Sequence, residues 1–413
     1  MQALIGILFL LAFAWLLSEN RRGVPWRTVG IALGLQVGIA VLLIHVGWIR
    51  AALLSLNVVV EALDSAAGEG AAFVFGYLGG GEPPFEVTRE SALQLFSVRL
   101  AAQILLFSVL TALGWYWGIL PLAVRAIGGA LRRTLGVGGA VGMGTAASIF
   151  VGPVEAALTV RPMLASMSRG ELFVLLTATM STVAGTVMVL YASILDPVLP
   201  GSLGHILAAS VISAPAAILF GMILVPAEAA TDSGTAVSVH YDSTMDAVSR
   251  GTGDGIRLVA NVLAMLVVFV ALVALVNMLL GVAPEVTGEP LTLQRLLGWL
   301  FAPVAWLIGI PWGEASTAGS LLGTKLVLNE LIAYLDLAAL PADALSGRSV
   351  LILAYALCGF ANLGSVGILV GGLLAMVPER RSEILALAPR ALISGTLATL
   401  TTGAVVGLVM PAH

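Results

Sequence analysis

The stretch from Gly313 to Asp336, GEASTAGSLLGTKLVLNELIAYLD, gathers ionisable and amide side chains inside an otherwise apolar part of the chain. It contains Glu314, the only lysine of the sequence (Lys325), and the adjacent pair Asn329 and Glu330. A charged side chain at the centre of a bilayer costs about 2.5–3.5 kcal/mol on insertion scales, so such a cluster requires a wet cavity lined by protein. The alternative is a short surface loop, in which these charges would have no special role.

Glycines at positions 313, 319 and 323 interrupt what would otherwise be one apolar helix. They predict a re-entrant hairpin, at about residues 299–340, whose short arms bring Asn329 and Glu330 to the middle of the membrane. A carboxylate and a neighbouring amide in such a cavity can bind a polar solute through charge-assisted hydrogen bonds.

A second segment of this kind lies in the first half of the chain, GVGGAVGMGTAASIFVGPVEAALTVRPML at residues 136–164. Gly152 and Pro153 end its first apolar arm and free backbone groups to line a cavity. The pattern predicts a first hairpin at about residues 137–165, with its tip at Gly152, Pro153, Val154 and Glu155. The alternative for Glu155 is a surface carboxylate on a connecting loop, although its neighbours on both sides are apolar.

Composition restricts the class of protein. The 413 residues are 59% hydrophobic and 10% charged, with a mean hydropathy of +1.05. Soluble domains carry about 25% charged residues, so the chain is an all-α polytopic membrane protein. One cysteine, Cys358, excludes an internal disulfide, and the four histidines are scattered, so no metal cluster or cofactor site is visible. No basic patch indicates a nucleic-acid partner.

Apolar runs and arginine positions predict one topology, with both termini on the exterior side. The acidic segment 50–90 suits the exterior and contains either an interfacial helix at 52–63 or a plain loop. A short cytoplasmic helix is expected at Met245–Arg250. Eight transmembrane helices are expected near residues 2–18, 29–48, 95–120, 172–195, 205–225, 255–280, 350–376 and 384–410.

The two halves of the chain repeat one pattern. In each half a hairpin with a glutamate is followed by a helix with a polar interruption, at residues 181–186 and at 359–365, and then by another span. Inverted repeats with discontinuous helices are the layout of secondary transporters, which bind substrate near the midplane. The expected division is N-terminal scaffold helices with an exterior or interfacial segment (1–94), a first repeat (95–226), a cytoplasmic connector with an interfacial helix (227–255) and a second repeat (256–413).

Four long strings carry a family resemblance: GPVEAALTVRP, LLGWLFAPVAWLIGIPWGEA, GTKLVLNELIAYLDL and ALCGFANLGSVGILVGG. Through them the chain resembles the concentrative nucleoside transporters of the bacterial, eight-span type over nearly its whole length. The resemblance implies a symporter of the cell (inner) membrane that takes up nucleosides by elevator-type alternating access. It also implies a homotrimer without enzymatic activity.

The resemblance assigns residues to two sites. Ribose hydroxyls would be held by Glu330, Asn362 and Ser365, beside Asn329. The base would lie between Phe360 and the tip residues Gly152, Pro153, Val154 and Glu155. A sodium ion would be bound by Ser148, Val151, Thr182 and Val183.

Two departures from the family pattern affect these expectations. Many members have Gln-Thr where this chain has Pro153 and Val154, so we expect tolerance of purines, or a preference for an unusual nucleoside, rather than strict uridine selectivity. Sodium-coupled members usually carry Asn at the position of Ser148. An all-oxygen sodium site is still expected, because the hydroxyls of Ser148 and Thr182 and the carbonyls at both breaks remain. The alternative is proton coupling through Glu155.

Three other functions compete with nucleoside symport. The chain could transport another ribose-like or polyol solute. It could be an intramembrane enzyme that uses Glu155 and Glu330 as an acid–base pair, although no nucleophile–histidine arrangement accompanies them. A receptor or scaffold is a further alternative, but it would not require two broken hairpins.

Overall fold

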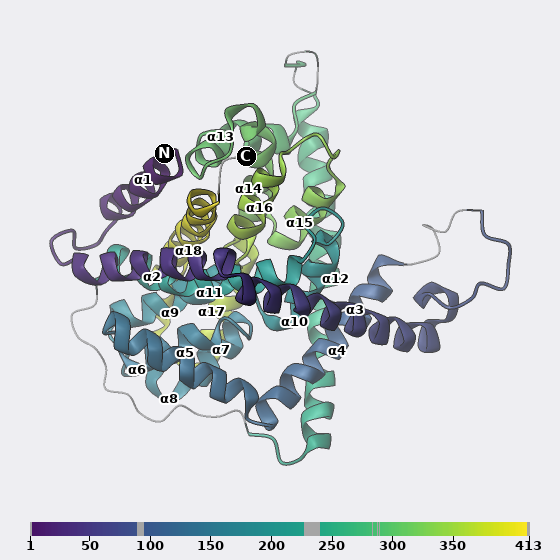
Figure 1. Ribbon diagram of the computed structural model, residues 1–413, viewed down its shortest axis with the longest axis horizontal. Helices are drawn as coiled ribbons and strands as arrows, with labels where there is room; N and C mark the ends of the chain where they lie inside the picture. Colours follow the sequence, from purple (N-terminus) through teal and green to yellow (C-terminus); the bar gives the residue numbers. More distant parts are fainter. Residues whose placement is uncertain are drawn as a thin grey trace.

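The computed structural model describes residues 2–88, 95–226, 240–282, 284–286, 288 and 290–410. Regular secondary structure in these residues is helical, as the composition predicts (Figure 1). The expected connector at 227–255 and the segment 281–291, which follows the span expected at 255–280, lie partly outside the described residues. The C-terminus beyond residue 410, expected on the exterior side, lies outside them as well.

The N-terminal part contains a longer helix than the sequence predicts. Its helices are α1 (Gln2–Leu16), α2 (Trp26–His45), α3 (Gly47–Phe75) and the short η1 (Gly76–Gly79). The expectation of a helix limited to 52–63, or of a loop, is wrong, because α3 is continuous over 29 residues. The many alanines of α3 are strong helix formers, and the helix ends only where Gly76 adopts a positive φ of 60°.

The described residues 95–226 contain eight helices. They are α4 (Phe96–Tyr116), α5 (Ile119–Leu135), α6 (Gly139–Ala147), α7 (Pro153–Thr159), α8 (Arg161–Leu164), α9 (Arg169–Ser181), α10 (Gly185–Leu195) and α11 (Ser202–Leu224). The span expected at 95–120 ends earlier: the chain turns at Gly118, whose φ is 79°, and Pro121 lies in the first turn of α5. Proline is tolerated there because the first backbone N–H groups of a helix have no partner within it.

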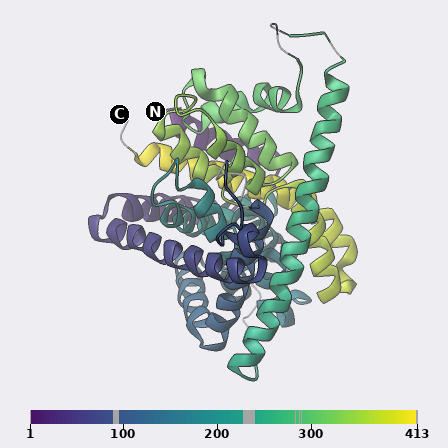
Figure 2. The same ribbon diagram turned by 90° about the vertical axis from the view of Figure 1, so that its right-hand side faces the viewer.

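The second half runs from α12 to α18. Its helices are α12 (Thr244–Leu280), α13 (Leu293–Leu307), α14 (Trp312–Val327), α15 (Glu330–Ala339), α16 (Gly347–Leu357), α17 (Leu363–Met376), η3 (Pro378–Arg380) and α18 (Arg381–Val409). A separate short helix at Met245–Arg250 is not found, because α12 is one helix of 37 residues that runs along the edge of the molecule (Figure 2). Gly251 and Gly255 lie inside it and allow close contact with α4: a Cβ at Gly251 would lie 2.9 Å from the Cα of Val109.

The glycines of the stretch from Gly313 to Asp336 also have a different role from the expected one. Gly313, Gly319 and Gly323 lie inside continuous α14, and the chain bends instead at Gly309, whose φ is 111°. The axes of α13 and α14 differ by 116° across this bend. A Cβ at Gly319 would lie 2.7 Å from the backbone nitrogen of Ala302, so this glycine permits direct packing of α14 on α13.

Six helical segments in the described part of the chain are long and apolar enough to cross a membrane, or seven if α13 and α14 are counted as one bent span. The expected first span, α1, has 15 residues, and the expected seventh consists of two shorter helices, α16 and α17. At the centre of the fold, α11 is buried along nearly its whole length and packs against α2, α9 and α18. The chain is therefore an all-helical polytopic membrane protein.

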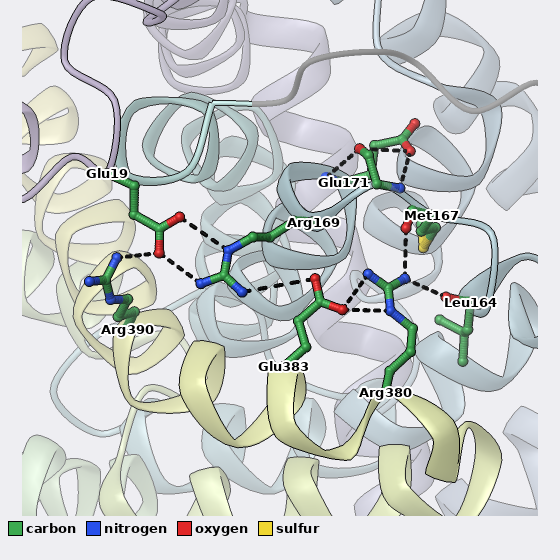
Figure 3. A network of polar contacts seen from close by, with 9 residues as sticks. Glu19, Leu164, Met167, Arg169, Glu171, Arg380, Glu383 and Arg390 are labelled. Carbon is green, nitrogen blue, oxygen red and sulfur yellow. Dashed lines mark hydrogen bonds and ion pairs between the residues drawn. The ribbon is translucent and has the colours of Figure 1, made fainter.

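An ionic network joins the connection between α1 and α2 to the starts of α9 and α18 (Figure 3). Arg169 donates to both oxygens of Glu19, at 3.1 and 2.8 Å, and Arg390 donates to the same carboxylate at 2.6 Å. Arg380 pairs with Glu383 and donates to the carbonyls of Leu164 and Met167, at 2.7 Å each. The hydrogen bond from Arg169, and then Arg390, hold the pKa of Glu19 below its ordinary value.

Candidate functional site at two helix breaks

The two polar interruptions expected from the sequence are real breaks, and they contact each other. Residues 182–184 separate α9 from α10, and residues 358–362 separate α16 from α17. The backbone N–H of Phe360 donates to the carbonyl of Thr182 at 3.2 Å. A Cβ at Gly359 would lie 3.0 Å from the carbonyl carbon and oxygen of Ser181, so the backbones approach closely at this point.

The tip of the first hairpin lies against the first break. Residues 148–152 form the turn between α6 and α7. The backbone N–H of Gly185 donates to the carbonyl of Phe150 at 2.9 Å, and a Cβ at Gly185 would lie 2.7 Å from that same oxygen. Chain segments from the tip and from both breaks therefore meet in one region.

Glu330 is the buried carboxylate of this region. Glu330 begins α15, whose N-cap is Asn329. Only 3% of the surface of Glu330 is exposed. The hydroxyl of Tyr191 donates to its Oε1 at 2.7 Å, and Nδ2 of Asn362 donates to its Oε2 at 3.0 Å. Hydrogen bonds to a carboxylate are stronger than those between neutral groups, so these two contacts fix the position of Glu330.

Asn362 is held from its other side as well. Its Oδ1 accepts the backbone N–H of Ser365 at 2.8 Å and so caps α17. Asn362 and Ser365 are both buried. The structure thus brings Glu330, Asn362 and Ser365 together, and the side chain of Asn329 caps α15 by accepting the N–H of Ile332 at 2.9 Å.

Tyr191 is a site residue that sequence reasoning missed. Its ring lies 5.3 Å from that of Tyr334, and its hydroxyl reaches Glu330 from α10. A tyrosine in an apolar helix is usually a core residue, and nothing in the spacing separated it from other aromatic residues. The only signal in the sequence was that Tyr191 lies in the helix that directly follows the first polar break.

Two expected members of the charged cluster make their hydrogen bonds with other helices. Glu314 accepts hydrogen bonds from the backbone and the hydroxyl of Ser346, at 3.2 and 3.1 Å, where α16 begins. Lys325 is buried and donates to Oγ1 of Thr399 at 2.9 Å and to the carbonyl of Ala356 at 3.5 Å, near the end of α16. The expectation of a single wet cluster is therefore corrected: both residues join helices, although Lys325 stays near enough to Glu330 for electrostatic attraction.

The first-hairpin tip has a different character. Gly152 caps α7, Pro153 is its first residue, and Glu155 is exposed in its first turn. The methyl groups of Val154 pack on α17, because a Cβ at Gly372 would lie 2.5 Å from one of them. Phe360, in the opposite break, is half-buried. This end of the site offers apolar contacts and one accessible carboxylate.

Oxygen atoms with spare acceptor capacity gather where the tip meets the first break. The Ser148 hydroxyl donates to the carbonyl of Thr145 at 2.8 Å, and the Thr182 hydroxyl to that of Ala178 at 3.1 Å, which leaves lone pairs on both oxygens. Val151 and Val183 are buried, and within the described ranges no backbone N–H is directed at either carbonyl. Buried carbonyls are normally paired, so this set of oxygens suits a hard cation.

Broken helices that meet inside a polytopic bundle are the architecture of secondary transporters. The chain belongs to the family of Na⁺-dependent, or concentrative, nucleoside transporters. Family descriptions match in order along it: the Na⁺ dependent nucleoside transporter N-terminus at residues 5–78, a nucleoside recognition "Gate" at 97–198, and the Na⁺ dependent nucleoside transporter C-terminus at 205–407. The resemblance expected from the four sequence strings is confirmed.

Relatives match over the whole chain. An uncharacterized transporter of Haemophilus influenzae is 38% identical over 99% of this chain and 97% of its own length. The nucleoside permease NupC of Helicobacter pylori is 37% identical over 98% of this chain and 97% of its own. Sodium/nucleoside cotransporter 1 of Mus musculus is 30% identical over 98% of this chain, which spans 63% of that longer protein.

Solved structures show the same fold. CNTnw in an inward-facing substrate-bound state superposes with a TM-score of 0.91, at 37% identity, over 99% of this chain and 97% of that one. A variant of CNTnw in an outward-facing state matches equally well, also with a TM-score of 0.91. The relative thus adopts both states of an alternating-access cycle.

Proposed function

We propose that this protein is a symporter that takes nucleosides into the cell, driven by a sodium gradient, through alternating access. Its family consists of transporters rather than enzymes, which argues against an acid–base role for Glu155 and Glu330. The observation that carries the proposal is the buried carboxylate of Glu330, held by Tyr191 and Asn362 where two helix breaks meet.

The second half of the chain would bind the ribose. A carboxylate has about four lone-pair positions, and Glu330 uses one on each oxygen for Tyr191 and Asn362. The remaining positions can accept both hydroxyls of a vicinal diol in charge-assisted hydrogen bonds. Ser365 and Asn329 would contribute further polar contacts beside it. A different ribose-like or polyol solute would use the same groups and is the second candidate substrate class.

The first half would bind the base. Pro153 and Val154 offer shape and apolar contact where many relatives carry a Gln-Thr pair, and Gly152 leaves backbone groups accessible. Phe360 would flank the base from the opposite break. With Glu155 as the main polar group at this end, purines should be accepted as well as pyrimidines.

Sodium would bind to the hydroxyls of Ser148 and Thr182 and to the carbonyls of Val151 and Val183. These oxygens form the kind of ligand set that hard cations prefer. Proton coupling through Glu155 is the alternative, and the experiment below separates the two.

We further infer the finer architecture. Helix α1 and the broken pair α16–α17 would each cross the membrane, giving eight spans with two hairpins, α6–α8 and α13–α15, in an inverted repeat. The arginine pattern places both termini on the exterior side of the inner membrane. The division at residues 1–94, 95–226, 227–255 and 256–413 and the homotrimer are part of the same proposal.

The proposal is tested by uptake of labelled adenosine and uridine into proteoliposomes. One arm applies a sodium gradient at fixed pH, and the other applies a pH gradient in sodium-free buffer. Accumulation of unmodified nucleoside in the sodium arm alone is expected. Full accumulation in the sodium-free arm would show that protons, rather than sodium ions, drive uptake. No accumulation in either arm would contradict nucleoside symport.

A further inference from the structure

Thr145 has an unusual hydroxyl for a threonine in a helix. Threonines elsewhere in this bundle, such as Thr177 and Thr179, donate to a backbone carbonyl three or four residues earlier. Thr145 lies in α6 and has no exposed surface, yet its Oγ1 has no hydrogen-bond partner within the described part of the chain. Burial of an unpaired hydroxyl is unfavourable, so its position requires an explanation.

The place of Thr145 in the fold supplies that explanation. It precedes Ser148 by three residues, so the two side chains lie on one flank of α6 and its C-terminal turn. This flank packs on α9, since a Cβ at the neighbouring Gly144 would collide with the side chain of Leu175. Helix α9 ends at the first break, beside Thr182. The unpaired oxygen therefore belongs to the same region as the oxygens proposed to bind sodium.

The two hydroxyls differ in what they can offer a cation. Ser148 already donates its proton to the carbonyl of Thr145, so its oxygen is fixed close to the backbone of α6. A serine oxygen is also a shorter ligand than the Asn amide that sodium-coupled relatives usually carry there. A second oxygen one turn earlier would offer a further ligand, and Thr145 carries an unpaired hydroxyl at that position.

We propose that Oγ1 of Thr145 is a further ligand of the coupling cation, in addition to Ser148, Val151, Thr182 and Val183. The proposal rests on the proposed sodium symport and extends it by one residue. Oxygen-only coordination by hydroxyl and carbonyl groups is chemistry suited to sodium. It explains why this helical threonine leaves the carbonyls of its own helix unused.

The test compares Thr145→Val with Thr401→Val. Both substitutions remove a buried hydroxyl that has no partner among the described residues, but Thr401 lies in α18, outside the proposed site. Two quantities are measured: the sodium concentration that gives half-maximal nucleoside uptake, and the rise in Tm of the purified protein as sodium chloride replaces choline chloride. Thr145→Val should raise the half-saturating sodium concentration for uptake about tenfold or more. The rise in Tm should likewise need about tenfold more sodium. Thr401→Val should match the wild type in both.

Thr145→Ser provides the second variant, because it keeps the oxygen. It should restore most of the sodium affinity, and it remains informative if the valine variant does not fold. Wild-type sodium dependence in an active Thr145→Val protein would overturn the assignment and indicate a buried water or a void. Loss of sodium affinity in Thr145→Ser equal to that in Thr145→Val would also overturn it. A wild type without any sodium response would instead refute the proposed symport itself, together with this extension.

Discussion

The two hairpin-and-break units of this protein share an architecture but differ in chemistry. In the second unit, Glu330 is buried and receives hydrogen bonds from Tyr191 and Asn362. In the first, Pro153 and Val154 are half-buried at the tip and Glu155 is exposed. Because a buried carboxylate is costly unless it is well paired, the second unit must be fixed in one geometry. We infer that the second unit specifies the sugar, while the first unit binds the base less selectively.

Glu330→Gln should have the largest effect. Each hydrogen bond to the charged carboxylate contributes about 1.5–3 kcal/mol, and the substitution weakens the contacts of Tyr191, Asn362 and the substrate together. We expect the kcat/KM of uptake to fall at least about a hundredfold, by the same principle. Gel filtration and Tm should show a folded protein. Near wild-type uptake would remove Glu330 from the site and with it the contrast between the two units.

Tyr191→Phe should have the next largest effect. It removes one donor to Glu330 and leaves the ring in place, so we expect uptake to fall about tenfold. Tyr334→Phe is the matched control, since Tyr334 is equally buried beside it but donates to the carbonyl of Ala354, at 2.9 Å. An equal loss in both variants would mean that the hydroxyls act through stability alone.

The first unit should affect selectivity rather than rate. Replacing Pro153 and Val154 by Gln and Thr adds side-chain hydrogen-bonding groups at the base end. The uridine concentration that halves uptake of labelled adenosine should then fall by about tenfold, as expected for one well-placed hydrogen bond. A panel in which the wild type already accepts only uridine and cytidine would contradict the looser base site proposed for this unit.

The smallest effect is expected away from both units, at Glu19. Its folded-state pKa lies below the ordinary 4.5, so its contribution to stability is present above pH 4.5 and is lost as the pH falls through the lower folded value. Glu19→Gln should lower stability by about 1 kcal/mol at neutral pH. The difference in Tm between variant and wild type should shrink below pH 4.5. A difference that grows in acid would contradict the sign of this pKa shift.

The sequence predicted the helical membrane class and both polar breaks, because small polar residues in an apolar helix are a local signal. It failed where the outcome depends on a neighbouring helix. Glycines 319 and 323 were expected to interrupt a helix, but they lie at close helix contacts inside continuous α14. The unbroken helix α14 separates Glu314, in its first turn, from Glu330, which lies beyond its end, because the breaks expected at its glycines do not occur.

Tyr191 shows the same limit within the site. Its hydroxyl reaches Glu330 across 139 residues of sequence, and only the packing of α10 on α15 brings them together. Local pattern identified Glu330 and Asn362, because carboxylates and amides are rare in apolar helices. It could not identify a partner whose residue type is ordinary there.

The central claim, that Glu330 recognises the ribose, is tested most directly by a substrate–mutant cycle. Binding of adenosine and of its 2′- and 3′-deoxy analogues is measured by calorimetry on the purified wild type and on Glu330→Gln, at saturating sodium. The wild type should prefer adenosine over at least one analogue by about tenfold to a hundredfold, as expected for a hydrogen bond to a charged group. In Glu330→Gln that preference should nearly disappear. An unchanged preference in the variant would contradict the assignment.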